Sequence, residues 1–150
     1  MAGLEPRTLD DLLADAQMRI ERVSPSEAHA ATRSGALLID IRSDSDREHE
    51  GVVPGSLHIP RTVLEWRTAP DSNLRNPHVG GLDCRLILLC NHGCSSVLAA
   101  ATLTDLGFTR AGDVVGGFEA WRDAGLPVGR APRRRRGAKE PAGMNGPEQA

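Results

Sequence analysis

The apolar residues of this chain follow two patterns, one with the period of a helix and one that is continuous. Helical spacing predicts an amphipathic helix over about 8–20, whose apolar face consists of Leu9, Leu12, Leu13, Ala16 and Ile20. A second helix, over about 25–33, is indicated by the N-cap residue Ser24, by Pro25 at the first helical position and by the capping-box residue Glu27. Both helices precede the first continuous apolar run.

Continuous apolar runs predict the strands. The segments 36–41 and 86–89 consist almost entirely of Ala, Leu and Ile, which is typical of strands that are covered on both faces. The other predicted elements are strands at 56–59 and 114–115, helices at 61–67, 96–106 and 118–123, and loops at 42–51 and 69–83. Strands that alternate with helices in this way predict an α/β fold with a parallel sheet.

Composition favours one domain in a reducing compartment. The 150 residues, 39% of them hydrophobic, suffice for a single core. The three cysteines lack the spacing of a disulfide framework, and the acidic N-terminus lacks the apolar segment of a secretory signal. No apolar run approaches the roughly 18 residues that a membrane span requires. The sequence therefore predicts a cytoplasmic protein that does not enter a membrane.

Charge is unevenly distributed along the chain, although the net charge is only −2. Residues 130–150 contain six basic and two acidic side chains, which leaves 12 basic and 18 acidic ones in residues 1–129, so that the two parts carry +4 and −6. An acidic body argues against nucleic-acid binding. We therefore divide the chain into an amphipathic helical extension (1–23), an α/β domain (24–129) and a basic, Pro- and Gly-rich tail (130–150) that is predicted to be disordered.

The candidate chemistry lies in a short polar loop between an apolar run and a helix. The loop consists of Cys90, Asn91, His92, Gly93, Cys94, Ser95 and Ser96. The N–H groups of a tight loop and of the first helical turn converge on one point, where the helix dipole favours negative charge. A thiol held there is shifted toward the thiolate, which is the nucleophilic form. A cysteine that ends a buried strand is, however, more often an inert apolar residue, so the loop alone leaves both interpretations open.

Five segments, in this order along the chain, together resemble a single-domain rhodanese, the sulfurtransferase homology domain. They are Leu38 to Arg42, Gly51 to Pro60, Leu88 to Ser96, Val115 to Trp121 and Gly125 to Val128. The resemblance implies a rhodanese-like α/β fold, with a central parallel sheet of about five strands flanked by helices on both faces. It also implies that Cys90 carries sulfur as a persulfide, which the N–H groups of residues 91–96 bind as an anion.

The partners and cofactors expected of this chain follow from the resemblance. A small-molecule sulfur donor such as thiosulfate is implied, together with a thiol or cyanide as the acceptor. Neither an organic cofactor nor a metal ion is implied. A zinc site is not expected from the residues either, because Cys84 and Cys90 lie at opposite ends of one predicted strand.

The loop departs from this family in lacking a basic residue. Active members commonly carry an arginine five positions after the cysteine, where this chain has Ser95. The Cys-x5-Arg pattern of protein tyrosine phosphatases is also absent, because position 96 is a serine, and this argues against phosphatase chemistry. Arg47, Arg61 and Arg67 are candidates for binding an anionic substrate from neighbouring loops, or they pair with nearby glutamates.

Three further residues have structural interpretations, and one of them, Cys94, also has a chemical one. Asp40 and Arg42, at the end of a predicted strand, are expected to fix the adjacent loops through hydrogen bonds. Cys94 either acts as a resolving thiol toward Cys90 or merely fills a small position.

Three functions are compatible with these residues. We favour a sulfurtransferase that works through a Cys90 persulfide. The alternatives are a non-catalytic binding or regulatory module with the same fold, and a redox sensor that uses Cys90 and Cys94. The sequence does not indicate the oligomeric state.

Overall fold

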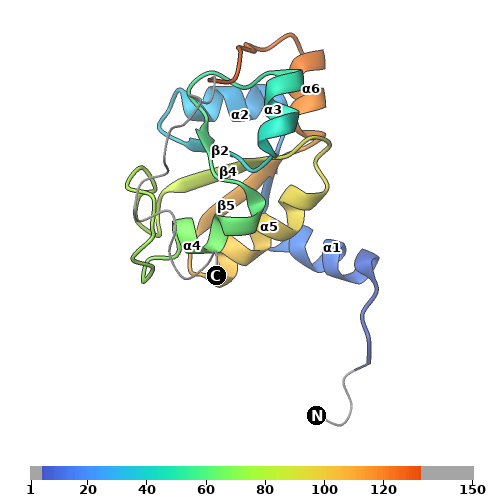
Figure 1. Cartoon of the computed structure of the whole chain (residues 1–150). Coiled ribbons are helices and arrows are strands. Elements are labelled where there is room, and N and C mark those ends of the chain that lie inside the picture. Colours follow the sequence, from blue (N-terminus) through green and yellow to red (C-terminus); the bar gives the residue numbers. More distant parts are fainter. Residues whose placement is uncertain (1–4, 133–150) are drawn as a thin grey trace.

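The computed structural model describes residues 5–132, which form a parallel sheet with helices on both faces (Figure 1). Its five strands, in the spatial order β1-β5-β4-β2-β3, all run parallel to their neighbours. The strands are β1 (Glu21–Val23), β2 (Leu37–Asp40), β3 (Leu57–His58), β4 (Arg85–Leu89) and β5 (Arg110–Val114). The predicted α/β class with a central parallel sheet is confirmed.

The helices form one layer on each face of the sheet. One layer contains α1 (Leu9–Met18), α5 (Ser95–Asp105), the 3-10 helix η1 (Arg61–Val63) and α4 (Leu64–Thr68). The other contains α2 (Pro25–Thr32) and α6 (Gly117–Asp123), whereas α3 (Asp44–Glu50) follows β2 directly. Leu86 and Leu88 of β4 pack toward the first layer, and Ile87 and Leu89 pack toward the second. Burial of both faces explains why this strand is apolar at every position from Leu86 onward.

Helix α1 is fixed to the domain by a small contact with α5. Ala16 is buried against Val97 and Ala101, whereas Leu9 and Leu12 of the predicted apolar face are 62% and 40% exposed. The predicted amphipathic helix is therefore present, but only its C-terminal half contributes to the core.

Two elements differ from the sequence-based expectation. The predicted polar loop over 42–51 contains the helix α3, none of whose residues is buried. Ser43 accepts a hydrogen bond from the Asp46 amide and caps this helix, so α3 is fixed by its cap and its polar contacts and has no apolar periodicity. The strand β1 was not predicted, because three residues at a sheet edge are too short for a pattern.

Strand β5 is longer than the predicted strand at 114–115, because a glycine and a charged residue interrupt its apolar pattern. A Cβ atom at Gly112 would lie 1.8 Å from the Glu21 carbonyl oxygen, so only glycine fits where β1 pairs with β5. Asp113, the next residue, is fully buried.

Two further findings concern the predicted tail and membrane-spanning helices. The run Arg133–Arg136 and most of the predicted tail lie outside the described residues. Between residues 5 and 132, no helix is both long and apolar enough to cross a membrane.

Candidate active site

Cys90 follows β4 at the carboxyl edge of the sheet, where ligand sites of parallel α/β folds lie. Its side chain is almost fully buried, with 6% of the residue exposed, at a pocket of about 330 Å³. The pocket is lined by Ile41, Arg42, Ser43, Asp46, Cys90, Asn91, His92, Cys94 and Ser95. The loop after β4 thus joins the segment between β2 and α3 around one thiol.

Polar groups of the loop surround the Cys90 sulfur. The Gly93 amide donates to Sγ at 3.1 Å, and Sγ lies 3.2 Å from Ser96 Oγ, which in turn donates to Asp113 Oδ2 at 2.7 Å. Burial raises the pKa of the Cys90 thiol, but the hydrogen bonds from Ser96, Ser95 and Gly93 outweigh it and lower the pKa below its ordinary value. The surroundings of Cys90 therefore favour the thiolate.

The backbone of the thiol loop is held from behind by the first turn of α6. The amide of Phe118 donates to the Cys90 carbonyl at 2.7 Å, and the amide of Glu119 donates to the Asn91 carbonyl at 3.1 Å. Gly117 permits this approach, because a Cβ atom there would lie 2.4 Å from the Cys90 carbonyl oxygen. The first turn of α6 therefore fixes the backbone of the thiol loop through Gly117 and two hydrogen bonds.

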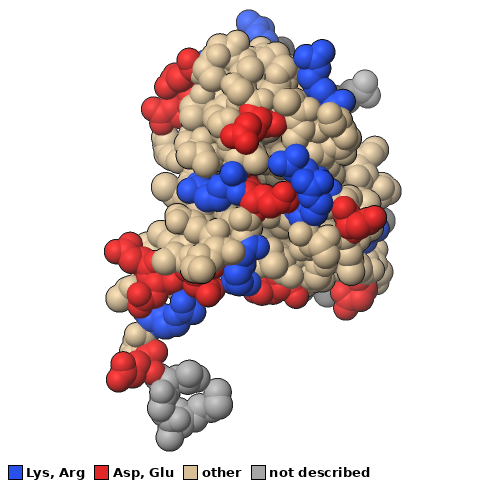
Figure 2. Space-filling view, turned by 180° about the vertical axis from the view of Figure 1, so that it is seen from behind, with Lys and Arg blue, Asp and Glu red and all other residues tan. Residues whose placement is uncertain are grey.

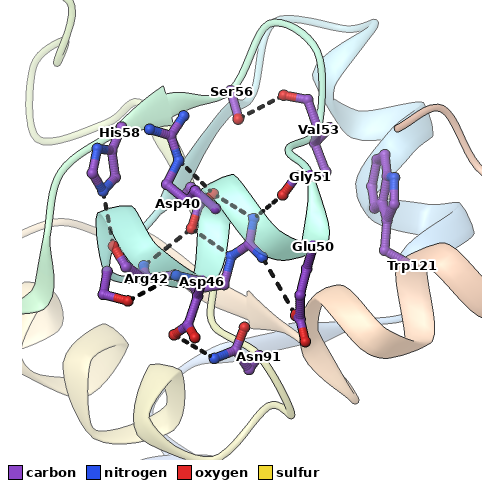
Figure 3. A network of polar contacts seen from close by, with 12 residues as sticks. Asp40, Arg42, Asp46, Glu50, Gly51, Val53, Ser56, His58, Asn91 and Trp121 are labelled. Atoms are coloured by element: carbon purple, nitrogen blue, oxygen red, sulfur yellow. Dashed lines mark hydrogen bonds and ion pairs between the residues drawn. The ribbon is translucent and has the colours of Figure 1, made fainter. Parts of the chain in front are cut away.

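A buried ionic network stands beside the pocket (Figure 3). Arg42 donates two hydrogen bonds to the Asp40 carboxylate, at 2.9 and 3.1 Å, and a third to the Gly51 carbonyl at 2.8 Å. Its guanidinium also stacks on the Phe118 ring, 4.0 Å from the centroid. Both charged residues are buried, and their contacts join the end of β2 to α3 and α6.

Asp46 brings a negative charge to the same pocket. Its Oδ2 accepts a hydrogen bond from Asn91 Nδ2 at 2.8 Å (Figure 3). Hydrogen bonds from Asn91 and Ser43 lower the pKa of this carboxyl group, so Asp46 is ionised at neutral pH. The lining of the thiol pocket is therefore partly acidic, which sequence reasoning missed because the helix α3 was not predicted.

The three arginines predicted as anion-binding candidates do not line this pocket. Arg47 donates to Asp40 at 3.2 Å, and Arg67 donates to the Leu74 carbonyl. Arg61 forms two hydrogen bonds with Glu65, at 2.9 and 3.0 Å, which is the pairing that the sequence left open. The arginine that lines the pocket is Arg42, and a further one, Arg22, reaches the thiol loop from β1.

The remaining loop side chains are exposed. His92 has 69% of its side chain exposed and places Nδ1 2.7 Å from Glu119 Oε2. Cys94 is exposed at the N-cap of α5, and it forms no disulfide.

Cys84 lies before β4, at the far end of that strand from Cys90. Among residues 5–132, no three His, Cys, Asp or Glu side chains are grouped as metal ligands.

Comparisons with known proteins identify relatives of this chain. The model of the rhodanese-like domain family matches residues 24–124. The thiosulfate sulfurtransferase GlpE of Stutzerimonas stutzeri is 38% identical over 103 residues, which cover 68% of this chain and 84% of that protein. The enzyme of the same name from Pseudomonas savastanoi is 34% identical over 103 residues, which cover 68% and 87% of the two chains.

Two solved structures share the fold. A Rhodopseudomonas palustris protein of unknown function, described as a possible tyrosine phosphatase, superposes with a TM-score of 0.75 and 33% identity over 85% of this chain and 98% of that one. The polysulfide-sulfur transferase homodimer of Wolinella succinogenes gives a TM-score of 0.65 with 22% identity, over 79% of this chain and 85% of the other.

Proposed function

The chain belongs to the rhodanese-like domain family, and we propose that it is a thiosulfate sulfurtransferase whose sulfur-carrying residue is Cys90. The single observation that carries the assignment to Cys90 is the position of its sulfur. It lies at the carboxyl end of β4, at the pocket of about 330 Å³, within 3.1 Å of the Gly93 amide. The named relatives, which match over most of their own length, support the reaction type.

The first half-reaction is a displacement at sulfur. The Cys90 thiolate attacks the outer sulfur of thiosulfate, a Cys–S bond forms, and the bond between the two thiosulfate sulfurs breaks. The electron pair of the broken bond leaves with sulfite, so that a Cys90 persulfide anion and sulfite are formed without any net oxidation. The Gly93 amide, which donates to Sγ, belongs to the loop whose N–H groups bind the persulfide anion.

The second half-reaction restores the thiolate. A cyanide ion or a thiolate of a small acceptor attacks the outer sulfur of the persulfide and becomes thiocyanate or a new persulfide, while the electron pair of the S–S bond returns to Cys90. The small donor and acceptor have access to Cys90 through the pocket that its side chain lines. No metal or organic cofactor takes part in either step, and we place the reaction in the cytoplasm.

The observed side chains fit sulfur transfer better than phosphoester hydrolysis. A phosphatase of the Cys-x5-Arg type binds three phosphoryl oxygens with a forked arginine at the position of Ser96. Here Ser96 is fully buried and directs its hydroxyl to Asp113, so it has no cation to offer. A persulfide carries one charge and is satisfied by amide donors, which the loop retains. The resemblance to the Rhodopseudomonas palustris protein therefore does not carry phosphatase activity to this chain.

The deciding experiment is mass spectrometry of the reduced protein after incubation with thiosulfate. We expect one added sulfur on the peptide that contains Cys90, and loss of that sulfur, with formation of thiocyanate, when cyanide is added. Cys90→Ser should take up none, whereas the matched variant Cys84→Ser, which changes a cysteine outside the pocket, should behave as the unaltered chain.

The competing functions give different results in the same experiment. A folded, reduced chain that takes no sulfur from thiosulfate or 3-mercaptopyruvate is a binding module, and the proposal is then wrong. A reversible disulfide between Cys90 and Cys94 under mild oxidant, without sulfur uptake, supports the redox sensor instead.

A further inference from the structure

Behind the thiol loop lies a partly buried ion pair that takes part in neither half-reaction. Arg22 of β1 and Asp113 of β5 are register neighbours in the sheet. The guanidinium forms a two-pronged contact with the carboxylate, with Nε 2.9 Å from Oδ1 and Nη2 3.1 Å from Oδ2. Asp113 is fully buried, and 25% of the Arg22 side chain is exposed.

Each member of the pair also contacts a residue that touches the Cys90 sulfur. Asp113 Oδ2 accepts the hydroxyl proton of Ser96, whose Oγ is 3.2 Å from Sγ. Arg22 Nη2 donates to the carbonyl of Gly93 at 3.0 Å, and the amide of the same glycine donates to Sγ. A guanidinium therefore stands behind a loop that lacks an arginine of its own.

The Ser96 hydroxyl has one proton, and it can donate that proton either to the Cys90 sulfur or to the Asp113 carboxylate. When Cys90 is a thiol, its S–H donates to Ser96 Oγ, which is 3.2 Å away, and the hydroxyl donates to Asp113 at 2.7 Å. When Cys90 is a thiolate, the sulfur becomes an acceptor, and the Ser96 proton must turn toward it and leave Asp113. Asp113 therefore competes with the sulfur for this proton, and Arg22 weakens the competition by pairing with the carboxylate.

We propose that the Arg22–Asp113 pair is a positioning device that decides which way the Ser96 proton points, and thereby how readily Cys90 ionises. The proposal rests on the proposed function only in taking Cys90 as the nucleophile. Ser96 is the group in contact with the sulfur, and Arg22 and Asp113 act through Ser96 and Gly93. Arg22 thus brings a positive charge from the edge strand to the back of the loop, although it does not line the pocket.

The electrostatics of Arg22 agree with this geometry. Its pKa is raised, mainly by the hydrogen bond to Asp113 and also by the negative charges of the Asp113, Cys90 and Cys94 side chains. By linkage, the positive charge of Arg22 stabilises the Cys90 thiolate in return. The other titratable groups around the thiol pocket are Arg42, Asp46, His92 and Cys94, with Glu119 in contact with His92.

The test measures the pH midpoint of Cys90 alkylation by iodoacetamide, with each cysteine quantified separately by peptide mass spectrometry. In Asp113→Asn, the side-chain oxygen of the new asparagine accepts from Arg22, because a guanidinium only donates. The asparagine NH2 group then donates to Ser96 Oγ. The Ser96 hydroxyl proton is therefore free to point at the Cys90 sulfur. We expect the midpoint of Cys90 to fall by about one pH unit, the usual size of the effect of one nearby charge. Adding Arg22→Gln to this variant removes the cation without leaving a buried carboxylate unpaired, and should bring the midpoint back up.

A matched control lies on the same two strands. Glu21 and Arg110 also bridge β1 and β5, at 3.2 and 3.3 Å, but both are exposed. Glu21→Gln and Arg110→Gln should leave the Cys90 midpoint unchanged. If loss of Asp113 only loosened the sheet, the midpoint would rise as the loop lost its donors, and it would not recover when Arg22 was changed as well.

A second variant decides the matter where Asp113→Asn does not fold. Ser96→Ala keeps the ion pair and removes the hydroxyl that donates to the thiolate, so the midpoint should rise by about one pH unit. An unchanged midpoint in Ser96→Ala, or in a folded Asp113→Asn, overturns the proposal. Because alkylation needs no sulfur donor, a chain that takes no sulfur from thiosulfate contradicts the proposed function and leaves this test unaffected.

Discussion

Gly117 lies so close to Cys90 that a single methyl group at position 117 would reach within 2.4 Å of the Cys90 carbonyl oxygen. The contact joins the start of α6 to the loop that follows β4, two segments that are distant in the sequence. It lets the Phe118 amide donate to the same oxygen at 2.7 Å. The conformation of the thiol loop therefore depends on a glycine that does not line the pocket.

Gly117→Ala should accordingly destabilise the fold by about 2 kcal/mol or more, because it combines a positive φ with a collision against backbone atoms. Urea unfolding measures the change. Gly125→Ala is the matched control, since Gly125 also has a positive φ but a methyl group there would meet no atom within 4 Å, so only the cost of the φ angle applies. Equal losses in the two variants would contradict the role of the contact.

Asp46→Asn should improve the use of thiosulfate. The ionised carboxylate at the pocket wall repels a dianion, and an asparagine removes that charge while its oxygen can still accept from Asn91. We expect KM for thiosulfate to fall several-fold with a smaller change in kcat, measured as thiocyanate formation at fixed cyanide. Glu48→Gln, an exposed acid of the same helix outside the pocket lining, is the control and should change little.

Arg42→Met should cost about 3 kcal/mol or more of unfolding free energy, because it leaves the buried Asp40 with Arg47 as its remaining ionic partner. The comparison is Arg61→Met, which breaks a partly exposed pair with Glu65 and should change stability by less than about 1 kcal/mol. Chemical denaturation of both variants tests the difference. A loss of similar size in both would mean that burial of the Asp40–Arg42 pair is unimportant.

The cysteines should differ in their response to pH. The pKa of Cys84 is raised, mainly by burial, whereas the pKa of Cys90 is lowered by its hydrogen bonds despite burial. As pH rises, Cys90 should therefore reach half-maximal alkylation before Cys84, and sulfur transfer should fall as pH is lowered through the Cys90 midpoint. In urea the two midpoints should converge near the ordinary thiol value, which makes the unfolded chain its own control.

Charged side chains are unevenly distributed over one face of the molecule. On the face shown in Figure 2, acidic side chains gather at the lower left, where α1 lies, whereas acidic and basic side chains alternate above it. Part of the acidic excess that the sequence places in residues 1–129 therefore lies on α1, which contains Asp10, Asp11 and Asp15.

The elements that the sequence predicted well are those whose burial is uniform. Leu86 to Leu89 are apolar throughout because both faces of β4 are covered, and Ser24, Pro25 and Glu27 specify the start of α2 by local contacts. The elements that were missed have other origins. Helix α3 has no buried residue, and β5 contains Gly112 and Asp113 for reasons that lie on β1 and α5.

Some residues of the candidate site were found from the sequence and others were not, for similar reasons. The loop from Cys90 to Ser96 was found from the sequence because a strand, a thiol and a helix start follow one another locally. Three charged residues near the site were not found. Arg22 lies on β1 and Asp46 lies on α3, and neither element was predicted. Asp113 was missed because it interrupts the apolar pattern of β5.

The sequence by itself determined the α/β class, the order of the main elements and the thiol that opens the loop, because apolar periodicity and capping are local properties of the chain. Only the tertiary structure decided which charges surround that thiol. Arg47, Arg61 and Arg67 are turned to other partners, whereas Arg22 reaches the loop through parallel pairing of β1 with β5. Charge pairing depends on which strands become neighbours, and a sequence read in one dimension does not contain those distances.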